Sequence, residues 1–282
     1  MLKKIYYNLP GVIQNYIDRA ASKISNNFEE EFIYSKIGYK HGLTTNDKIE
    51  IIKRIKKTLK KVESATSLNV HLELGKKILS LENQEGFIVE CGCFKGATTI
   101  SLSIFSKIVG KKLIVYDSFE GLPLDTDRFK ERNYPYLNLT GKYKEGMYQG
   151  GLEEVKENVN NFGEIDFCIF RKGFFEETMK DHSEKIDFLF LDVDLVKSTE
   201  DCVKYLWKYL SDNSYIYSDD ACDIDVVKFW YDHKWWQENY MCDPPGYIGS
   251  GCGIPIGGKY SSLGFTVKNQ SKINFKKAHF LY

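Results

Sequence analysis

Three short apolar runs, each followed at once by acidic residues, constrain the fold of this chain most strongly. The runs occupy residues 87–89, 188–191 and 215–217 and are rich in aromatic and β-branched side chains. Such runs are typical of buried parallel strands. The acids that follow them are Glu90, Asp192, Asp194, Asp219 and Asp220. Because the carboxyl ends of strands in an open α/β sheet border one ligand crevice, we expect these acids to meet in a single site.

From about residue 86 onward, apolar runs alternate with segments of helical periodicity. Strands are predicted near 87–91, 112–117, 167–170, 186–192 and 214–218, and helices near 96–109, 151–161, 198–210 and 223–233. A glycine-rich stretch follows Pro245, and residues 263–267 fit an antiparallel edge strand. The alternation predicts right-handed βαβ units, and therefore an α/β fold with a mainly parallel sheet and helices on both faces.

The first part of the chain is predicted to be a helical extension over residues 1–65, ahead of a main domain at 66–282. Thr45 or Asn46 can cap a helix there. Its apolar positions are Ile51, Ile52, Ile55, Leu59 and Val62, a stripe that should pack on the main domain. The other face carries Lys53, Lys56, Lys57, Lys60 and Lys61. For these lysines a solvated face is favoured over a surface for an anionic substrate or lipid headgroups.

Composition argues for a small-molecule partner. Lysine and arginine total 39 and aspartate and glutamate total 39, so no net charge recruits nucleic acid or an acidic membrane. No apolar stretch approaches the ~20 residues of a membrane span, and the N-terminus does not read as a signal peptide. The seven cysteines lack zinc-site spacing, so we expect reduced thiols and a cytoplasmic location. The oligomeric state stays open, a homo-oligomer included.

The first acidic cluster has the spacing of a nucleoside-binding turn, Glu90-x-Gly92-x-x-x-Gly96. Gly92 allows a tight turn and Gly96 lets the start of the next helix approach a ligand, where free amides attract a carboxylate or phosphate. Asp117 ends the following strand and is placed to accept hydrogen bonds from two ribose hydroxyls. Glu90 would suit a cationic tail, so S-adenosylmethionine fits better than NAD. The alternative is that the glycines only make a turn.

The other two clusters offer oxygen ligands for a metal. Asp192, Asp219 and Asp220 would place three carboxylates at neighbouring strand ends, a ligand set that magnesium prefers. Asp194 lies just beyond one strand end and could take a proton from a substrate hydroxyl. Capping of the helices that follow is the alternative role for these aspartates.

Five segments in order are similar to the macrocin O-methyltransferase family, whose members are metal-dependent sugar O-methyltransferases of the class I fold. The similarity spans about residues 65–235. Its motifs are residues 90–96, 117–123, 173–178, 192–199 and 219–220. The resemblance implies a Rossmann-like, mainly parallel seven-stranded sheet. It also implies methyl transfer to a hydroxyl of a sugar or glycoconjugate, in polysaccharide, glycolipid or glycosylated-metabolite biosynthesis.

The resemblance also assigns roles to individual residues. It implies that S-adenosylmethionine is bound by Glu90, Cys91, Gly92, Gly96, Thr98, Asp117, Ser118, Lys172, Gly173, Phe174 and Asp192. It implies that magnesium is held by Asp192, Asp219 and Asp220, with Asp194 as the general base.

The substrate-facing positions depart from the family pattern, which leaves the acceptor open. Val193, Val196 and Lys197 replace the usual glycine, tyrosine and glutamate, and Ala221 replaces a tyrosine. A catechol-type phenol is the first alternative acceptor, because two adjacent hydroxyls could chelate the same metal. A non-catalytic module with residues 48–62 as its interface is the second alternative.

Several aromatic residues and histidines near the motifs have open roles. The segment 121–151 is long for a βα loop and fits either a lid over the acceptor or a plain surface loop. Its tyrosines are Tyr134, Tyr136, Tyr143 and Tyr148. For Trp230, Trp235 and Trp236 a core or dimer role is favoured over stacking on a sugar. His182 and His233 are not expected to be catalytic.

Overall fold

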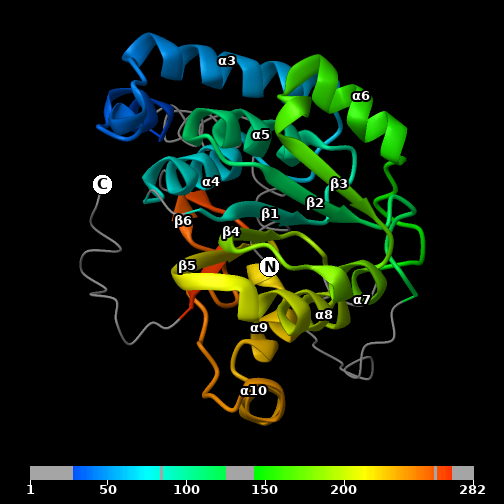
Figure 1. Cartoon of the computed structure of the whole chain (residues 1–282). Coiled ribbons are helices and arrows are strands. Elements are labelled where there is room, and N and C mark those ends of the chain that lie inside the picture. The colour runs from blue at the N-terminus through cyan, green and yellow to red at the C-terminus, as the bar shows by residue number, and fades with distance from the viewer. Residues whose placement is uncertain (1–27, 83–84, 125–142, 257–258, 269–282) are drawn as a thin grey trace, which may run out of the picture.

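A six-stranded sheet with helices on both faces forms the centre of the molecule (Figure 1). The computed structural model describes residues 28–82, 85–124, 143–256 and 259–268. The strand order is β3-β2-β1-β4-β5-β8, and all neighbours pair in parallel except β5 and β8, which are antiparallel. The predicted mainly parallel α/β sheet and its antiparallel edge strand are confirmed.

Within the described residues the sheet has six strands, where the family resemblance implied seven. They are β1 (Phe87–Cys91), β2 (Leu113–Asp117), β3 (Cys168–Lys172), β4 (Ile186–Leu191), β5 (Leu210–Ser218) and β8 (Gly264–Val267). Two more short strands, β6 (Pro255–Ile256) and β7 (Lys259–Tyr260), pair with each other in a separate antiparallel hairpin. This hairpin is a sheet of its own, and β8 pairs with β5 at the edge of the main sheet.

The strand register aligns the carboxyl ends of the central strands. Cys91 of β1 pairs with Leu191 of β4, and Leu191 in turn pairs with Ser218 of β5. Strand β4 is buried along its whole length, as expected for a continuous apolar run between two helical layers. The residues that directly follow these strands therefore lie along one edge of the sheet.

Two helical layers cover the sheet, one above and one below it in Figure 1. The upper layer contains α3 (Thr45–Lys61), α4 (Leu68–Ser80), α5 (Ala97–Val109) and α6 (Leu152–Phe162). The lower layer contains α7 (Phe175–Thr178), α8 (Val196–Leu206), α9 (Ile224–Phe229) and α10 (His233–Tyr240). Residues 28–34 are also helical. Short 3-10 helices span Tyr39–His41, Ile165–Phe167, Met179–Asp181, Trp207–Tyr209 and Asp220–Cys222.

Helix α3 joins the same hydrophobic core as the main sheet. Its buried residues Ile51 and Ile55 belong to one apolar cluster with Phe105 of α5 and Ile88 of β1. The prediction that the apolar stripe packs on the main domain is confirmed. The predicted cap was wrong by one residue, because the helix is capped by Thr44 in a reciprocal capping box with Asp47.

The exposed surface and the tryptophans also match their expected roles. Trp230 and Trp236 are fully buried, with ring centroids 6.2 Å apart, so they are core residues.

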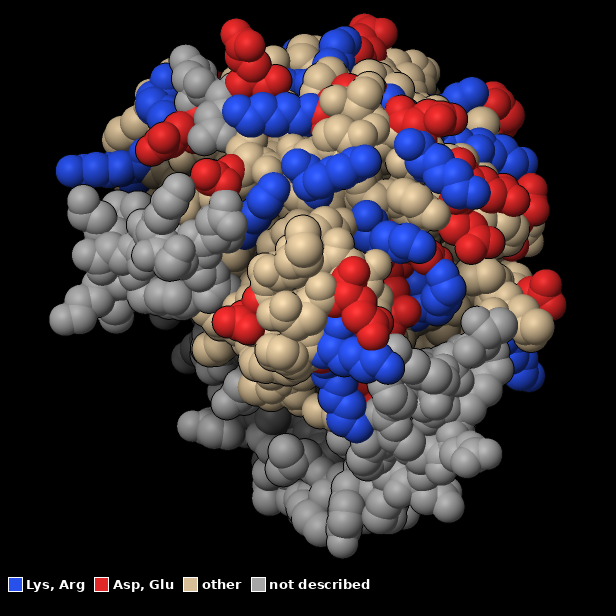
Figure 2. All heavy atoms as spheres, turned by 60° about the horizontal axis from the view of Figure 1, so that its bottom comes forward, with Lys and Arg blue, Asp and Glu red and all other residues tan. Residues whose placement is uncertain are grey.

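Figure 2 shows basic and acidic side chains interspersed over the described part of one face. Lys53 and Lys56 on the outer side of α3 form ion pairs with Glu50 and Glu29. In the described residues, no helix has the length and apolar character needed to cross a membrane.

Candidate active site

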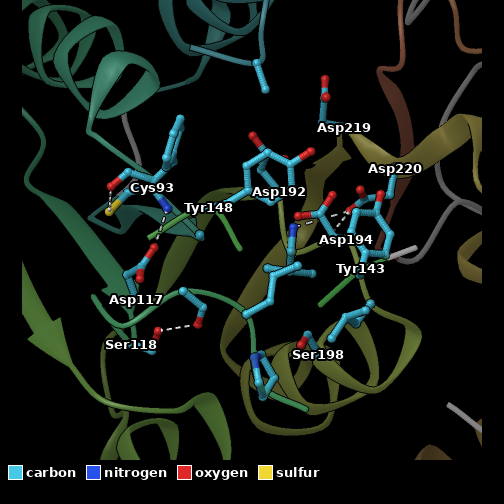
Figure 3. Close-up of a pocket in the computed structure, with 18 of the residues that line it drawn as sticks. Cys93, Asp117, Ser118, Tyr143, Tyr148, Asp192, Asp194, Ser198, Asp219 and Asp220 are labelled. Carbon is cyan, nitrogen blue, oxygen red and sulfur yellow. Dashed lines mark hydrogen bonds between the residues drawn. The ribbon is translucent and has the colours of Figure 1, made fainter. Parts of the chain in front are cut away.

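A cavity of about 690 Å³ lies at the carboxyl edge of the sheet. The loops after β1, β2, β4 and β5 border it, and so does the segment before α4. Figure 3 shows Asp117 and Ser118 on one side of this cavity and Asp194 and Asp220 on the other, with Asp192 between them. The acids at separate strand ends therefore share one site.

The glycines of the first turn serve chain packing. Gly92 has a φ of 81°, and a Cβ there would lie 2.0 Å from the Asp192 carbonyl oxygen, so only glycine lets the loops after β1 and β4 come this close. Gly96 has a φ of 88° and faces Val155 of α6, with a Cβ contact of 3.0 Å. The space beside Gly96 is thus filled by a helix, whereas we had expected the glycine to open it to a ligand.

Asp117 is fixed in place by the backbone of two neighbouring loops. Its Oδ2 accepts a hydrogen bond from the Cys93 amide at 2.7 Å and its Oδ1 accepts one from the Phe119 amide at 2.6 Å. Burial raises the pKa of Asp117, while these amides oppose the shift. Each carboxylate oxygen keeps a further lone pair, so Asp117 can still accept hydrogen bonds from a ligand in the cavity.

Glu90 lies behind the cavity wall. Its side chain is fully buried, and neither carboxylate oxygen has a hydrogen-bond partner at normal distance. Burial raises the pKa of Glu90 to about 8; the nearby Thr99 hydroxyl lowers it and Asp117 raises it further. The group is therefore mainly protonated at neutral pH in the ligand-free protein.

The proposed cofactor residues divide into two groups by position. Those that border the cavity are Gly92, Thr98, Asp117, Ser118, Phe174 and Asp192. Those that do not border it are Glu90, Cys91, Gly96, Lys172 and Gly173. Cys91 points into the apolar cluster of the α8 side, and Lys172 forms an ion pair with Glu120 at 3.2 Å.

The four aspartates after β4 and β5 lie close enough to perturb one another. Burial, then Asp219, Asp220 and Asp194, hold the pKa of Asp192 well above its ordinary range. Burial and Asp194 raise the pKa of Asp219 to about 7, and its Oδ1 has no hydrogen-bond partner. Such a group of buried carboxylates is unfavourable without a compensating positive charge.

This donor set fits a divalent cation in its chemistry. Magnesium prefers hard carboxylate oxygens, and the unpartnered Asp219 Oδ1 offers one that the protein itself does not use. In the part of the chain that the structure describes, no three His, Cys, Asp or Glu side chains stand together as a complete ligand group. The residues thus fit the ion by charge and by the type of ligand atom.

Asp194 has a backbone conformation that side chains rarely adopt. Its φ is 59°, in the left-handed region, and its amide donates to Asp220 Oδ2 at 3.2 Å. Burial raises the pKa of Asp194 to about 6, and a hydrogen bond from Tyr143 lowers it. Residues in this conformation concentrate at functional sites, and Asp194 borders the cavity.

Comparison with known proteins decides the family. The macrocin-O-methyltransferase (TylF) family profile matches residues 69–243, which contain Asp117 and the four aspartates after β4 and β5. The chain belongs to the macrocin-O-methyltransferase family. The resemblance noted from the sequence motifs is thereby confirmed.

The sequence identity between this chain and individual relatives is low. The chain is 28% identical over 155 residues to 8-demethyl-8-(2,3-dimethoxy-alpha-L-rhamnosyl)-tetracenomycin-C 4'-O-methyltransferase of Streptomyces olivaceus, a match covering 49% of this chain and 55% of that protein. It thus spans about half the length of this curated relative. The structure of the O-methyltransferase NovP is similar with a TM-score of 0.57 and 16% identity, covering 78% of this chain and 97% of that one, which shows a shared fold.

The glycine-rich tail explains the alanine that replaces the family's usual tyrosine. The Ala221 amide donates to the Ser262 carbonyl at 2.9 Å, and the Ala221 carbonyl accepts from the Gly251 amide at 2.7 Å. A Cβ on Gly264 would lie 2.7 Å from the Ala221 Cβ. The tail therefore packs directly on the turn after β5, and it brings Ser262 to the cavity.

Several residues that border the cavity were not singled out in the sequence. They are Phe94, Leu122, Leu195, Asp201, Asp223, Ser262 and residues 63–66. Tyr143 and Tyr148 of the suggested lid also border it, and Tyr148 contacts Phe94 edge-on at 5.7 Å. Tyr134 and Tyr136 of that segment lie outside the described residues. Phe94, Leu122 and Leu195 lie inside the sequence motifs, and the two tyrosines lie in a tyrosine-rich loop. The remaining residues gave no signal, because their contacts are tertiary.

The two histidines discussed from the sequence do not border the cavity. His182 is buried and hydrogen-bonds the Tyr116 hydroxyl and the Glu184 carbonyl, each at 2.8 Å. His233 is exposed and lies 3.4 Å from Asp243. The placement of both agrees with structural or surface roles.

Proposed function

We propose that this protein is an S-adenosylmethionine-dependent and magnesium-dependent O-methyltransferase that acts on a sugar hydroxyl of a glycoconjugate or its precursor. The observation that carries the proposal is the shared cavity, in which Asp117 faces a second group of acids at Asp192, Asp194 and Asp220. Family membership and a curated relative named as an O-methyltransferase of a rhamnosyl compound support it. In this proposal residues 66–282 form the catalytic domain and residues 1–65 the helical extension.

One side of the cavity would bind the cofactor. Asp117, held by the amides of Cys93 and Phe119, is oriented to accept hydrogen bonds from ribose hydroxyls. Thr98 and Phe174 also border the cavity and would contact the rest of the molecule. S-adenosylmethionine supplies the electrophilic methyl group when it is bound.

The other side would bind and deprotonate the acceptor. Asp192, Asp219 and Asp220 would hold magnesium, which supplies positive charge to acceptor oxygens. Asp194 would take the proton from the acceptor hydroxyl. The hydroxyl oxygen would form the new bond to the methyl carbon while the bond from that carbon to sulfur breaks. A raised pKa makes Asp194 a stronger base than an ordinary aspartate.

Binding and turnover measurements on single variants test this proposal. Asp194→Asn should keep cofactor affinity and lose turnover by about a hundredfold or more, as expected for a general base. Asp219→Asn should lose the response to magnesium. Asp181→Asn, an exposed aspartate that does not border the cavity, is the matched control and should behave like the parent.

A screen of acceptors with labelled cofactor distinguishes the substrate classes. Methylation of sugars, and not of catechols, is expected. Methylation of catechols alone would replace the sugar by a phenol. If the parent shows no binding of S-adenosylmethionine by calorimetry, with or without magnesium, the proposed function is wrong. Equal turnover by Asp194→Asn and the parent would remove the assigned base.

A further inference from the structure

A buried chain of hydrogen bonds links helix α4 to the cavity. His71 Nε2 lies 2.7 Å from the Thr66 hydroxyl, and His71 Nδ1 lies 2.6 Å from the Ser101 hydroxyl of α5. The Thr66 hydroxyl lies 3.1 Å from the Thr98 hydroxyl and 3.0 Å from that of Ser64. His71 thus holds one end of a set of hydroxyl groups from two separate segments.

The two ends of this chain of hydrogen bonds have different surroundings. His71 is fully buried in α4, which packs closely against α5. Thr66 and Thr98 both border the cavity. Thr98 is the second residue of α5, and the helix is capped by Gly96 with no side-chain hydrogen bond. The first amides of α5 therefore lack a side-chain partner at the place where the two hydroxyls reach the cavity.

His71 acts in this chain as a neutral group. Burial lowers its pKa to about 4, and no charged group contributes to the shift. One ring nitrogen therefore donates and the other accepts at neutral pH. A neutral imidazole with a hydroxyl at each nitrogen fixes the rotamer of Thr66, a task that an apolar side chain in the same space could not perform.

We propose that His71 is a positioning residue of the cofactor site, which acts through Thr66 to fix the Thr66 and Thr98 hydroxyls for the carboxylate of an α-amino-acid tail. Hydroxyl donors beside the start of a helix favour an anion. Glu90, on the strand that leads into the same turn, has two oxygens without a hydrogen-bond partner at normal distance, but it lies behind the cavity wall and is assigned no contact with that tail. The inference rests on the proposed function, because S-adenosylmethionine carries such a tail.

Two histidine variants separate positioning from packing. The amide of His71→Gln can replace Nε2 and keep the bond to Thr66, whereas the shorter amide of His71→Asn can replace Nδ1 and keep the bond to Ser101. Each variant loses one buried hydrogen bond, so both should have similar unfolding temperatures. Binding is measured by calorimetry with S-adenosylmethionine and with 5′-methylthioadenosine, which lacks the amino-acid tail.

We expect His71→Asn to weaken S-adenosylmethionine binding about tenfold and His71→Gln to stay within about twofold of the parent. Thr66→Val should weaken it about tenfold and Thr66→Ser, which keeps the hydroxyl, should restore it. All four should bind 5′-methylthioadenosine like the parent. The two Thr66 variants change a residue of the cavity wall, so they test the inference even if a histidine variant does not fold.

The inference is overturned if the glutamine and asparagine variants weaken S-adenosylmethionine binding equally, or if 5′-methylthioadenosine binding falls in parallel. It is also overturned if Thr66→Val binds S-adenosylmethionine like the parent. Failure of the parent protein to bind S-adenosylmethionine would overturn the proposed function and this inference with it. If the parent protein binds S-adenosylmethionine, any of the three earlier results overturns this inference and leaves the proposed function standing.

Discussion

Glu90 places a carboxyl group in the interior with no hydrogen-bond partner at normal distance for either oxygen. Its pKa rises from the ordinary value of 4.5 to about 8, mainly through burial, so the folded protein retains a proton that the unfolded chain releases. Between the pKa of the unfolded chain, 4.5, and that of the folded protein, about 8, a rise in pH therefore favours unfolding. We expect the ligand-free protein to lose stability from about pH 4.5 to pH 8, with a contribution from Glu90 on the order of a few kcal/mol.

Denaturant unfolding of Glu90→Gln at pH 5 and pH 8 measures this contribution. The variant should lose less stability than the parent over this range, because its amide does not titrate. The buried aspartates remain and keep part of the slope. Glu85→Gln, at an exposed glutamate, is the control and should keep the parental slope. An unchanged slope in Glu90→Gln would show that Glu90 is not the titrating group.

Residue roles were predictable to different extents. The strand-end aspartates could be placed at the cavity because each follows an apolar run, and parallel strands bring their ends together. Glu90 also follows an apolar run, yet it is the second-last residue of β1 and lies behind the wall, because side chains within a strand alternate between the two faces of the sheet. His71 gave no sequence signal, because Ser101 and Thr98 are on another helix.

The elements were more predictable than the contacts between them. The bounds of strands β1, β2 and β4 lie within one residue of the predicted bounds, because a short continuous apolar run is typical of a buried parallel strand. Of the helix predicted at 223–233, only residues 224–229 form a helix, α9, and α10 begins at His233, where the predicted helix was to end, with Asp232 as its cap. The β6–β7 hairpin could not be predicted, because glycine-rich segments carry no hydrophobic period.

Helix α3 belongs to the N-terminal segment but shares the core of the sheet, so a cavity there should destabilise the whole structure. We expect Ile55→Ala to reduce the free energy of unfolding by about 2–4 kcal/mol, the usual cost for a fully buried isoleucine. Denaturant unfolding should still show one transition. Lys60→Ala, on the exposed face, should change stability by less than about 0.5 kcal/mol. A separate early transition in Ile55→Ala would contradict a shared core.

Ala221 tests the fit of the glycine-rich tail to the turn after β5. Ala221 is fully buried, and its Cβ lies so close to the Gly264 backbone that a Cβ added to that glycine would be only 2.7 Å away, which leaves no room for a tyrosine ring. Ala221→Tyr should therefore destabilise by about 3 kcal/mol or more in denaturant unfolding, whereas Ala221→Gly should cost about 1 kcal/mol. If both variants were equally stable, the tail would have to move away from the turn without cost.

At the scale of the whole molecule, the sheet gathers acids that the sequence separates by more than a hundred residues. Asp117 lies on one side of the cavity and Asp194 and Asp220 on the other, with Asp192 between them, and Asp219 also borders it. Surface charges of both signs are interspersed (Figure 2), whereas four aspartates cluster at the carboxyl ends of β4 and β5. The fold thus concentrates negative charge at one place, which suits a cationic ligand and a metal ion.

Magnesium should stabilise the folded protein, and more strongly at higher pH. The pKa values of Asp194 and Asp219 are raised to about 6 and about 7, so these groups hold protons at pH 5 and release them by pH 8. Since a cation competes with those protons, its affinity should rise over this range. At a concentration a hundredfold above its dissociation constant, magnesium should add about 2.7 kcal/mol to the free energy of unfolding at pH 8.

Thermal unfolding with magnesium chloride, against sodium chloride of equal ionic strength, measures this effect. The increase in midpoint should be larger at pH 8 than at pH 5, and Asp219→Asn should abolish most of it, because the buried Oδ1 without a partner is the clearest open donor of the group. Asp181→Asn should respond like the parent. An equal increase in Asp219→Asn and the parent would place the bound cation elsewhere, and a larger increase at pH 5 would contradict competition between magnesium and protons at the aspartates.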